Sequence, residues 1–449
     1  MACKLPLIFP ALALALLASC GQGSRRSAAD FQVEQHVRWL ASRMAPNRTL
    51  PVVHPSRQNL ILSYDVPESD AGYPHLHNKS FAYDNALAAI AFASAGDWDR
   101  AEKLLVSQST LVRNDGSLWF NYNLAIDWPS ETDAGFALIR TGAVAWTGYA
   151  FCYFLENRPG LSREDKIYPM FLNTARKIAG FILSATITRP SDPLYGLVTG
   201  GSNTITLTLD TAGRVAEKWF EGPVTWASTE HNIDAHLFLC HLYALTRDPQ
   251  YRDPAERIAA QTLKVLWSDR DGQFFRGIKG NGVIDSVLAL DCAAWAAVFL
   301  RNIGRDSLAD RCLAVLEQDY RNTYNGLTGY RPYLRTPVYE TKEINRFYYP
   351  ESPGLQWGDF PFLWMEGGYG VLLALEAAGK KDEARAVLKT WFARFSADTL
   401  GGIPYSVAEQ PVPYQFTLWK SVASTAWHVI LAEHLSGKKM KRPFFSRAE

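Results

Sequence analysis

The sequence predicts an all-α fold, a closed ring of six helical hairpins with short β-hairpins in its long loops. Two observations support this: two kinds of helical segment alternate six times, and the long connections all fall on one side of that alternation. A helix that is apolar all round must be buried on every side, whereas a one-sided helix lies at a surface. Six such pairs therefore give an inner ring of buried helices inside an outer ring of amphipathic ones.

The inner segments are rich in Ala and Leu and nearly all apolar. They are expected at 81–95, 140–155, 230–245, 287–303, 362–378 and 419–435. Five of them are followed, usually after a short turn with Gly or Asp, by a charged amphipathic segment, at 98–111, 166–182, 251–267, 307–320 and 381–395. The sixth outer segment is expected at 31–44, where it would close the ring from the N-terminal side.

The connections from each outer segment to the next inner one are long and rich in Gly and aromatic residues. Three of them have related sequences and are expected to form short β-hairpins, at 115–120, 271–275 and 401–406. All of these loops should gather at the end of the ring where the inner helices begin, which is called the mouth below. Long loops on a rigid scaffold commonly carry function, so the mouth is the predicted site.

The N-terminal segment has the pattern of an export signal. After Lys4, the apolar run at 5–17 is shorter than the roughly 20 residues that span a bilayer as a helix, so residues 1–19 are predicted to be a signal peptide. The ending Leu-Ala-Ser-Cys resembles a bacterial lipoprotein signal, which implies acylation at Cys20, and Gly21 implies the outer membrane. An ordinary signal peptide, or a buried helix with a chance Cys, is the alternative.

This pattern divides the chain into four parts. A signal peptide at 1–19 is followed by a lipidated linker at 20–30, the helical ring at 31–436 and a basic tail at 437–449. The expected location is outside the cytoplasm, on the outer membrane or the periplasmic face, with the membrane reached through the lipid anchor. A monomer is expected.

Charge and cysteine content exclude several classes of protein. The 46 basic and 45 acidic residues give a formal charge of +1, which provides no long-range attraction to nucleic acid. His231, His236 and His241 are spaced by five residues, so they face different sides of a helix and no shared metal is expected; no cofactor is expected either. Buried thiols are favoured for the four later cysteines, with one disulfide left open, at Cys152, Cys240, Cys292 and Cys312.

Three inner segments open on acidic and aromatic residues, in the stretches 83–88, 229–234 and 364–368. With the six inner and six outer helices, these openings make the chain resemble the six-hairpin, or (α/α)6, glycosidase superfamily over residues 31–436. No single family within it is matched. The resemblance implies a catalytic domain, a carbohydrate substrate and hydrolysis by two carboxyl groups, and it favours inversion at the anomeric carbon.

Hydrolysis of a glycoside needs one carboxyl that protonates the leaving oxygen and one carboxylate that activates water. Glu230 is the predicted acid, because it opens the most polar inner segment beside Trp226, where apolar surface can raise its pKa. A capping-box carboxylate is the alternative. Asp84 and Glu366 are equally ranked candidates for the base. Asp84 could instead only balance the helix dipole, and the glycines after Glu366 could serve helix packing.

The predicted substrate-binding residues surround these acids. Asp234 lies one turn after Glu230 and needs a polar role, because an unpaired buried Asp is costly. Arg140 and Lys420 begin inner segments and are expected to pair with an acidic side chain or a substrate carboxylate. Aromatic faces offer apolar platforms to sugar rings, although about half should only anchor loops. The complete predicted set is Tyr83, His231, Asp234, Arg140, Lys420, Trp119, Trp128, Trp226, Trp364 and Trp419.

Three alternative functions remain open from the sequence. A polysaccharide lyase would use Tyr or His to remove a proton beside a uronate, with Arg140 or Lys420 neutralising the uronate carboxylate. A sugar 2-epimerase-like enzyme would use His231 or His428 as proton carriers. A surface lipoprotein that binds glycans without turnover is the third alternative.

Overall fold

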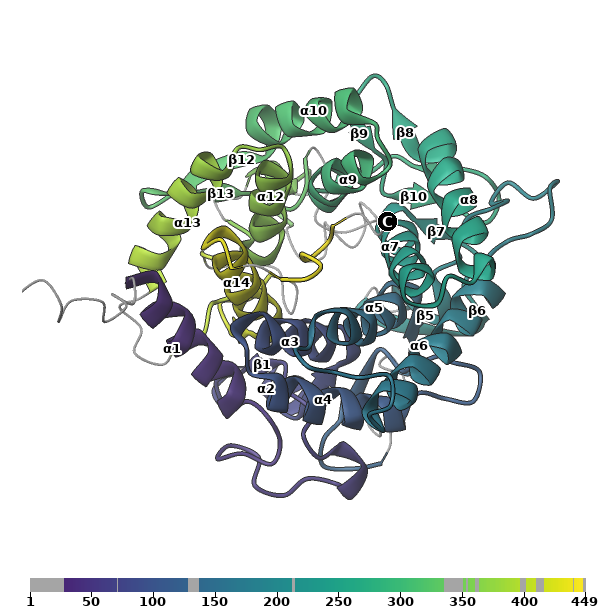
Figure 1. The fold of residues 1–449 in the computed structure, drawn as a ribbon. Helices are drawn as coiled ribbons and strands as arrows, with labels where there is room; N and C mark the ends of the chain where they lie inside the picture. The colour runs from purple at the N-terminus through teal and green to yellow at the C-terminus, as the bar shows by residue number, and fades with distance from the viewer. Residues whose placement is uncertain are drawn as a thin grey trace, which may run out of the picture.

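The computed structural model describes residues 28–70, 72–127, 137–211, 215–334, 350–352, 354–359, 363–395, 401–408, 416–438 and 440–446. The predicted signal peptide, the lipidation site Cys20 and the predicted platform Trp128 lie outside these residues. Within the described part, twelve long helices form two concentric rings (Figure 1).

The inner ring is closed. In the described residues it consists of six helices: α3 Ala82–Ala95, α5 Thr141–Asn157, α7 Thr229–Thr246, α9 Asp291–Asn302, α12 Met365–Ala377 and α14 Val422–Leu435. Each packs against the next in this order, and α14 packs back against α3. This arrangement confirms the predicted ring.

The outer ring covers the inner one. It comprises α4 Trp98–Leu111, α6 Ile167–Ser184, α8 Pro249–Leu266, α10 Asp306–Val315 with a π-helical turn at Leu316–Tyr320, α13 Lys381–Phe395 and α1 Ala28–Ser42. The first five pack on the inner helix that precedes them in the chain, whereas α1 packs on α14. The N-terminal outer helix therefore closes the ring, as predicted.

The burial of each helix follows its sequence pattern. Every residue of α5 is buried, as expected of a helix that is apolar all round. In α8 only one stripe is buried, at Tyr251, Ala255, Ile258, Ala259, Thr262 and Leu266. The turns within hairpins also follow from their own residues. Gly96 ends α3 with a left-handed φ of 89°, and the Asp97 side chain then accepts the Arg100 N–H to cap α4.

Short antiparallel strands join the loops at the mouth. In the described residues the pairs are β1 Tyr64–Asp65 with β14 Lys420–Ser421, β2 Lys79–Phe81 with β3 Asn121–Asn123, β8 Trp267–Ser268 with β9 Gln273–Phe274, and β12 Arg321–Tyr324 with β13 Leu327–Tyr330. Two three-stranded sheets are β4 Ile139–Arg140, β5 Gly201–Leu209 and β6 Val215–Pro223, and β11 Ile284–Asp285, β10 Gly277–Ile278 and β7 Ala227–Ser228. A short helix, α2 Tyr73–Leu76, precedes β2.

The predicted β-hairpins exist, but their positions differ from those expected. Of the three expected stretches, 271–275 contributes one strand, β9, and 401–406 contributes isolated bridges to Trp364 and Lys420. The stretch 115–120 forms turns and bends before β3. The longest hairpin, β5–β6, was not predicted.

The end of the chain returns to the ring at the end opposite the mouth, called the base below. Lys438, Arg442 and Phe445 reach the C-terminal ends of α3, α5 and α9 (Figure 1). Phe444 and Phe445 are only 3% and 2% exposed. Residues 440–446 of the predicted basic tail are therefore packed into the ring.

Two further observations concern the cysteines and the membrane. No disulfide joins the described cysteines, and Cys152, Cys292 and Cys312 are buried. Among the described helices, none is both long and apolar enough to cross a bilayer.

Candidate active site

Five carboxylates gather at the mouth, where the inner helices begin. They are called the acid cluster below and comprise Asp84 on α3, Glu230 and Asp234 on α7, Asp291 on α9, and Glu366 on α12. Desolvation raises the pKa of Glu366, Asp234 and Asp291, and the charge of Glu230 adds to the rise in each, as the charge of Asp84 does for Glu366. The residue predicted as the acid and both residues predicted as the base therefore lie in one cluster.

Glu230 is exposed, yet protein surrounds it closely enough that desolvation raises its pKa. The helix start does not use its carboxylate, because the Ser228 side chain caps α7 by accepting the His231 N–H at 3.1 Å. His231 is thus at the capping-box position N3, and Glu230 is at N2.

Glu366 is held by hydrogen bonds and is 9% exposed. Burial raises its pKa to about 8, and hydrogen bonds from the hydroxyl groups of Tyr83 and Tyr405 act in the opposite direction. The Tyr83 hydroxyl donates to Glu366 Oε1 at 2.8 Å and accepts the indole N–H of Trp427 at 3.1 Å. Tyr83 therefore contacts the cluster, where the sequence placed it.

Asp84 lies beside Glu366 at the start of α3. Its side chain is 4% exposed, and desolvation raises its pKa to about 7, while a hydrogen bond with Ser63 partly offsets this. The Tyr64 ring lies near both Asp84 and Glu366, and their charges raise the pKa of its hydroxyl further above the value set by burial.

Asp234 and Asp291 complete the cluster. Asp234 is 3% exposed, and desolvation and then the charges of Glu230 and Asp291 raise its pKa well above the ordinary value. The indoles of Trp146 and Trp295 lie close enough to favour its ionised form, but Asp234 Oδ1 and Trp295 Nε1 have no hydrogen-bond partner. Asp291 was missed by the sequence prediction, although it opens the fourth inner helix as Asp84, Glu230 and Glu366 open theirs.

Arg140 lies on β4, which pairs with β5, and Trp226 directly precedes β7. Arg140 Nη1 donates to the Asn203 carbonyl at 2.7 Å, and burial lowers the Arg140 pKa to about 10. Its guanidinium lies 5.8 Å from the Trp226 ring, which is 5.6 Å from the His231 ring. The expected acidic partner of Arg140 is thus replaced by backbone carbonyls.

His231 is a neutral imidazole at physiological pH. Burial and then the charge of Arg140 lower its pKa to about 3, and its Nδ1 has no hydrogen-bond partner. Gly142 at the start of α5 packs directly on this group: a Cβ at this glycine would lie 2.5 Å from His231 Cδ2 and 3.0 Å from Asp234 Oδ2.

The other predicted binding residues occupy different places. Trp364 is half-buried and packs beside Tyr405, close to Glu366. Trp419 is buried and donates its indole N–H to Asp70 at 2.8 Å, so it anchors a mouth loop. Trp119 stacks against Arg113, and Lys420 lies on β14 opposite Asp65.

His428 lies outside the acid cluster. It is fully buried on the outward side of α14, where its Nδ1 is 2.7 Å from the Tyr369 hydroxyl and its ring packs on Phe392 of α13 and His36 of α1. A role as proton carrier at the mouth, considered from the sequence, is therefore incompatible with its position.

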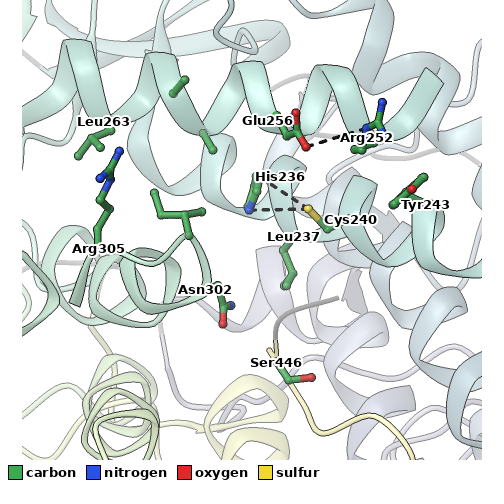
Figure 2. A pocket seen from close by; sticks show the side chains of 13 residues that line it. His236, Leu237, Cys240, Tyr243, Arg252, Glu256, Leu263, Asn302, Arg305 and Ser446 are labelled. Carbon is green, nitrogen blue, oxygen red and sulfur yellow. Dashed lines mark hydrogen bonds and ion pairs between the residues drawn. The ribbon is translucent and has the colours of Figure 1, made fainter. Parts of the chain in front are cut away.

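A cavity of about 370 Å³ lies between α7, α8 and α9, on the outward side of α7 and away from the acid cluster (Figure 2). His236 and Cys240 lie on its α7 wall, with Cys240 Sγ 3.7 Å from His236 Nε2. None of the acid-cluster residues lines it. Across the described chain, no three His, Cys, Asp or Glu side chains are arranged to hold a metal ion.

Comparison with solved structures identifies the fold. A D-mannose isomerase superposes with a TM-score of 0.55 at 12% identity, covering 92% of this chain and 99% of that one. A glycosidase in complex with glucose superposes with a TM-score of 0.58 at 13% identity, covering 91% of this chain and 97% of that one. A family 76 glycoside hydrolase from a bovine Bacteroides thetaiotaomicron strain superposes with a TM-score of 0.56 at 10% identity, covering 92% of this chain and 78% of that one.

At these identities the likeness shows the fold alone, an (α/α)6 ring of six helical hairpins like the rings of these glycosidase and isomerase structures. The resemblance inferred from the helix pattern is therefore confirmed at the level of fold. No sequence family and no curated protein sequence matches the chain.

Proposed function

We propose that this protein is a glycoside hydrolase that cleaves a poly- or oligosaccharide with two carboxyl groups of the acid cluster. The observation that carries the proposal is the pair Glu230 and Glu366: after desolvation, the charge of Glu230 adds to the rise in the Glu366 pKa, and the two groups differ in their surroundings. Pairs of carboxyl groups with different surroundings are how such enzymes separate an acid from a base.

Hydrogen bonding assigns the two roles. Desolvation raises the pKa of Glu366 to about 8, but hydrogen bonds from Tyr83 and Tyr405 partly offset this rise, so Glu366 can ionise in mildly alkaline solution and act as the base; only desolvation acts on Glu230, and it favours the protonated form. Glu230 then gives its proton to the glycosidic oxygen as the bond to the anomeric carbon breaks. Glu366 takes a proton from the water that attacks that carbon from the opposite face. The negative charge of Asp84 adds to the rise in the Glu366 pKa that desolvation causes, so Asp84 opposes the ionised form of Glu366.

The charge of the cluster favours a reacting sugar without a carboxylate. Within the described residues, no ion pair involves any of the five acids, and Arg140 is occupied by backbone carbonyls. A uronate would add a sixth carboxylate beside them, so this charge distribution disfavours the polysaccharide lyase. The Trp226 face, beside His231 and near Glu230, is the platform we assign to a sugar ring.

The test is cleavage of a glycan panel, read by product mass. The purified protein should release sugars with the mass of added water. Glu230→Gln and Glu366→Gln should each lower kcat/KM by about 10²- to 10⁴-fold. Glu383→Gln, on the exposed face of α13, is the matched control and should change nothing. Unsaturated products that absorb in the ultraviolet would instead identify a lyase, and binding without any cleavage would identify a glycan-capture protein.

A sugar isomerase or 2-epimerase is the second candidate. His231 favours it, because this neutral imidazole beside Glu230 has an unpartnered Nδ1 and could accept a proton from a sugar carbon. Such an enzyme would leave the substrate mass unchanged in ordinary water but incorporate deuterium from heavy water. His231→Gln would then abolish exchange, whereas a hydrolase would show no carbon-bound deuterium.

We also propose export and membrane attachment through an acylated Cys20. In cells, the wild-type protein should then partition with membranes, and mass spectrometry should find the acyl groups on residue 20. Cys20→Ala should move the protein out of the membrane fraction; equal distribution of both forms would contradict the anchor.

A further inference from the structure

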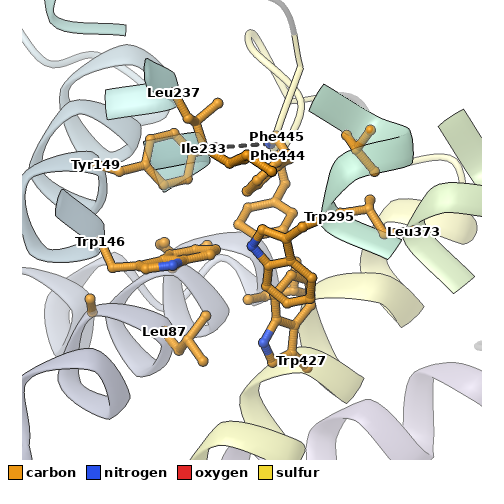
Figure 3. Close-up of a cluster of buried hydrophobic side chains, with 14 of the residues drawn as sticks. Leu87, Trp146, Tyr149, Ile233, Leu237, Trp295, Leu373, Trp427, Phe444 and Phe445 are labelled. Atoms are coloured by element: carbon orange, nitrogen blue, oxygen red, sulfur yellow. Dashed lines mark hydrogen bonds between the residues drawn. The ribbon is translucent and has the colours of Figure 1, made fainter. Parts of the chain in front are cut away.

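Three tryptophans from three inner helices form a layer of rings in contact with one another (Figure 3). Trp146 comes from α5, Trp295 from α9 and Trp427 from α14, and their ring centroids lie 5.0–6.3 Å apart in edge-on contacts. Each belongs to the second turn of its helix, one turn below the mouth. The layer therefore forms the floor of the proposed active site.

The indole layer is connected to the acids above it. The Trp427 N–H donates to the Tyr83 hydroxyl, which in turn donates to Glu366, so one chain of two hydrogen bonds links the layer to the proposed base. The indoles of Trp146 and Trp295 lie under Asp234 and favour its ionised form. Movement of the layer would therefore change the position and protonation of two acids.

The C-terminal segment supports this layer from the base. The Phe444 ring packs 5.2 Å from Trp427 and 6.1 Å from Trp146, and the Phe445 ring packs 5.9 Å from Trp146 and 6.2 Å from Trp295 (Figure 3). Both phenyl rings are buried. Two adjacent residues thus contact all three indoles.

The segment is fixed by polar contacts with three inner helices. The Phe445 N–H donates to the Tyr149 hydroxyl at 2.9 Å, and Asn302 Nδ2 donates to the Phe445 carbonyl at 3.0 Å. Arg442 pairs with Glu156 at 2.9 Å, and the same carboxylate is 2.7 Å from His241 Nδ1. These bonds set the height at which the two phenyl rings meet the indoles.

We infer that Phe444 and Phe445 are positioning residues of the active site, which act on Glu366 and Asp234 through the tryptophan layer. This inference rests on the proposed hydrolase. Without the phenyl rings, the indoles would have free space on the base side, and Trp427 would no longer be held against Tyr83. Tyr83 would then lose its fixed orientation and donate less well to Glu366, whose ionised form would be less favoured.

The test compares Phe444→Leu with Trp427→Phe, which keeps an aromatic ring but removes the indole N–H. The Glu366 carboxyl is titrated directly by carbon-13 NMR of labelled glutamate, with Glu366→Gln to assign its signal. Both variants should move the titration midpoint upward from about 8, and kcat should fall roughly 10-fold with KM unchanged. Phe171→Leu is the control, because Phe171 is as deeply buried but packs between α5 and α6.

The outcomes separate the two proposals. Phe444→Leu and Phe171→Leu should lower Tm by similar amounts, but only Phe444→Leu should move the titration midpoint of Glu366. An unchanged midpoint and an unchanged kcat in Phe444→Leu would overturn the inference. Should Phe444→Leu fail to fold, Phe444→Met decides by the same two measurements. If the wild type cleaves no glycan, the hydrolase proposal fails, and the NMR midpoint alone decides whether the segment positions Glu366.

Discussion

The Tyr83 hydroxyl donates a 2.8 Å hydrogen bond to Glu366, which lies 283 positions later in the sequence. The two residues belong to helices that both pack against α14 in the inner ring. Tyr83 lies on α3 and Glu366 on α12, so the bond spans the start of α14. It joins the first inner helix to the fifth in chain order, and its donor favours the charged form of the proposed base.

Tyr83→Phe should therefore impair the chemistry more than the fold. Glu366 loses a donor to its carboxylate, so its pKa should rise further above about 8, and kcat should fall by roughly 10- to 100-fold. Tyr330→Phe is the matched control, since it removes a buried hydroxyl that donates to Glu317 at 2.7 Å, away from the cluster. Equal activity of the two variants would show that Tyr83 has no part in catalysis.

The raised carboxyl pKa values predict that the ligand-free protein loses stability as pH rises from about 6.5 to 8. Asp84 and Glu366 titrate at about 7 and 8 when folded but near 4 when unfolded, so between those limits the folded state binds more protons. Each contributes a slope of up to about 1.4 kcal/mol per pH unit. Burial lowers the pKa of His231 to about 3, so the titration of this imidazole makes stability rise with pH, but only below about pH 6.5.

Urea unfolding at pH 6.5, 7.5 and 8.5 measures this slope. The double variant Asp84→Asn/Glu366→Gln should reduce it, because neither replacement titrates. A wild-type free energy of unfolding that increases over this range would contradict the assignment of protonated carboxyl groups to the folded protein.

Gly142→Ala should disturb the mouth locally. The added Cβ would lie 2.5 Å from His231 Cδ2 and 3.0 Å from Asp234 Oδ2, so both side chains must move and kcat/KM should fall at least roughly 10-fold. Gly180→Ala is the control: this exposed helical glycine of α6 has open space around it, and Ala should add about 0.5–1 kcal/mol of stability. Activity of Gly142→Ala at the wild-type level would mean that His231 and Asp234 can shift without consequence.

Glu156→Gln should loosen the C-terminal segment. Glu156 is buried between His241 and Arg442, and removing its charge leaves Arg442 without its carboxylate, at a cost of about 1.5–3 kcal/mol. Thermal unfolding measures the loss, and limited proteolysis should cut near residue 440 sooner than in the wild type. In Glu433→Gln, a comparable charge is removed from the Lys438 pair on the surface, and the cleavage rate should stay the same.

Helical periodicity was sufficient to predict the ring, because each inner helix is locally distinct from its outer partner. The inner segment expected at 230–245 is α7, Thr229–Thr246. The segment expected at 287–303 begins later, at Asp291, because Leu290 donates its N–H to Pro332 and Ala289 pairs with Tyr333 in a loop. Apolar loop residues that pack under the mouth cannot be distinguished from a helix by composition.

The site was predicted less completely than the ring. The acids at helix openings could be inferred, since the topology brings all openings together, and Asp291 was visible by the same criterion. Arg140 could not be placed, because its carbonyl partners belong to the β5–β6 hairpin, which lies outside the repeat. Phe444 and Phe445 lie among basic residues, and only the folded ring reveals what they contact.

The packing of α1 on α14 has a consequence for how the molecule folds. Five of the hairpins join helices that are neighbours in the chain, so they can form early from local contacts. The sixth brings His36 and His428 within 4.5 Å, and this contact must wait until nearly the whole chain has been brought together. We therefore expect closure by α1 to be the slow, rate-limiting event, with an open five-hairpin arc as its precursor.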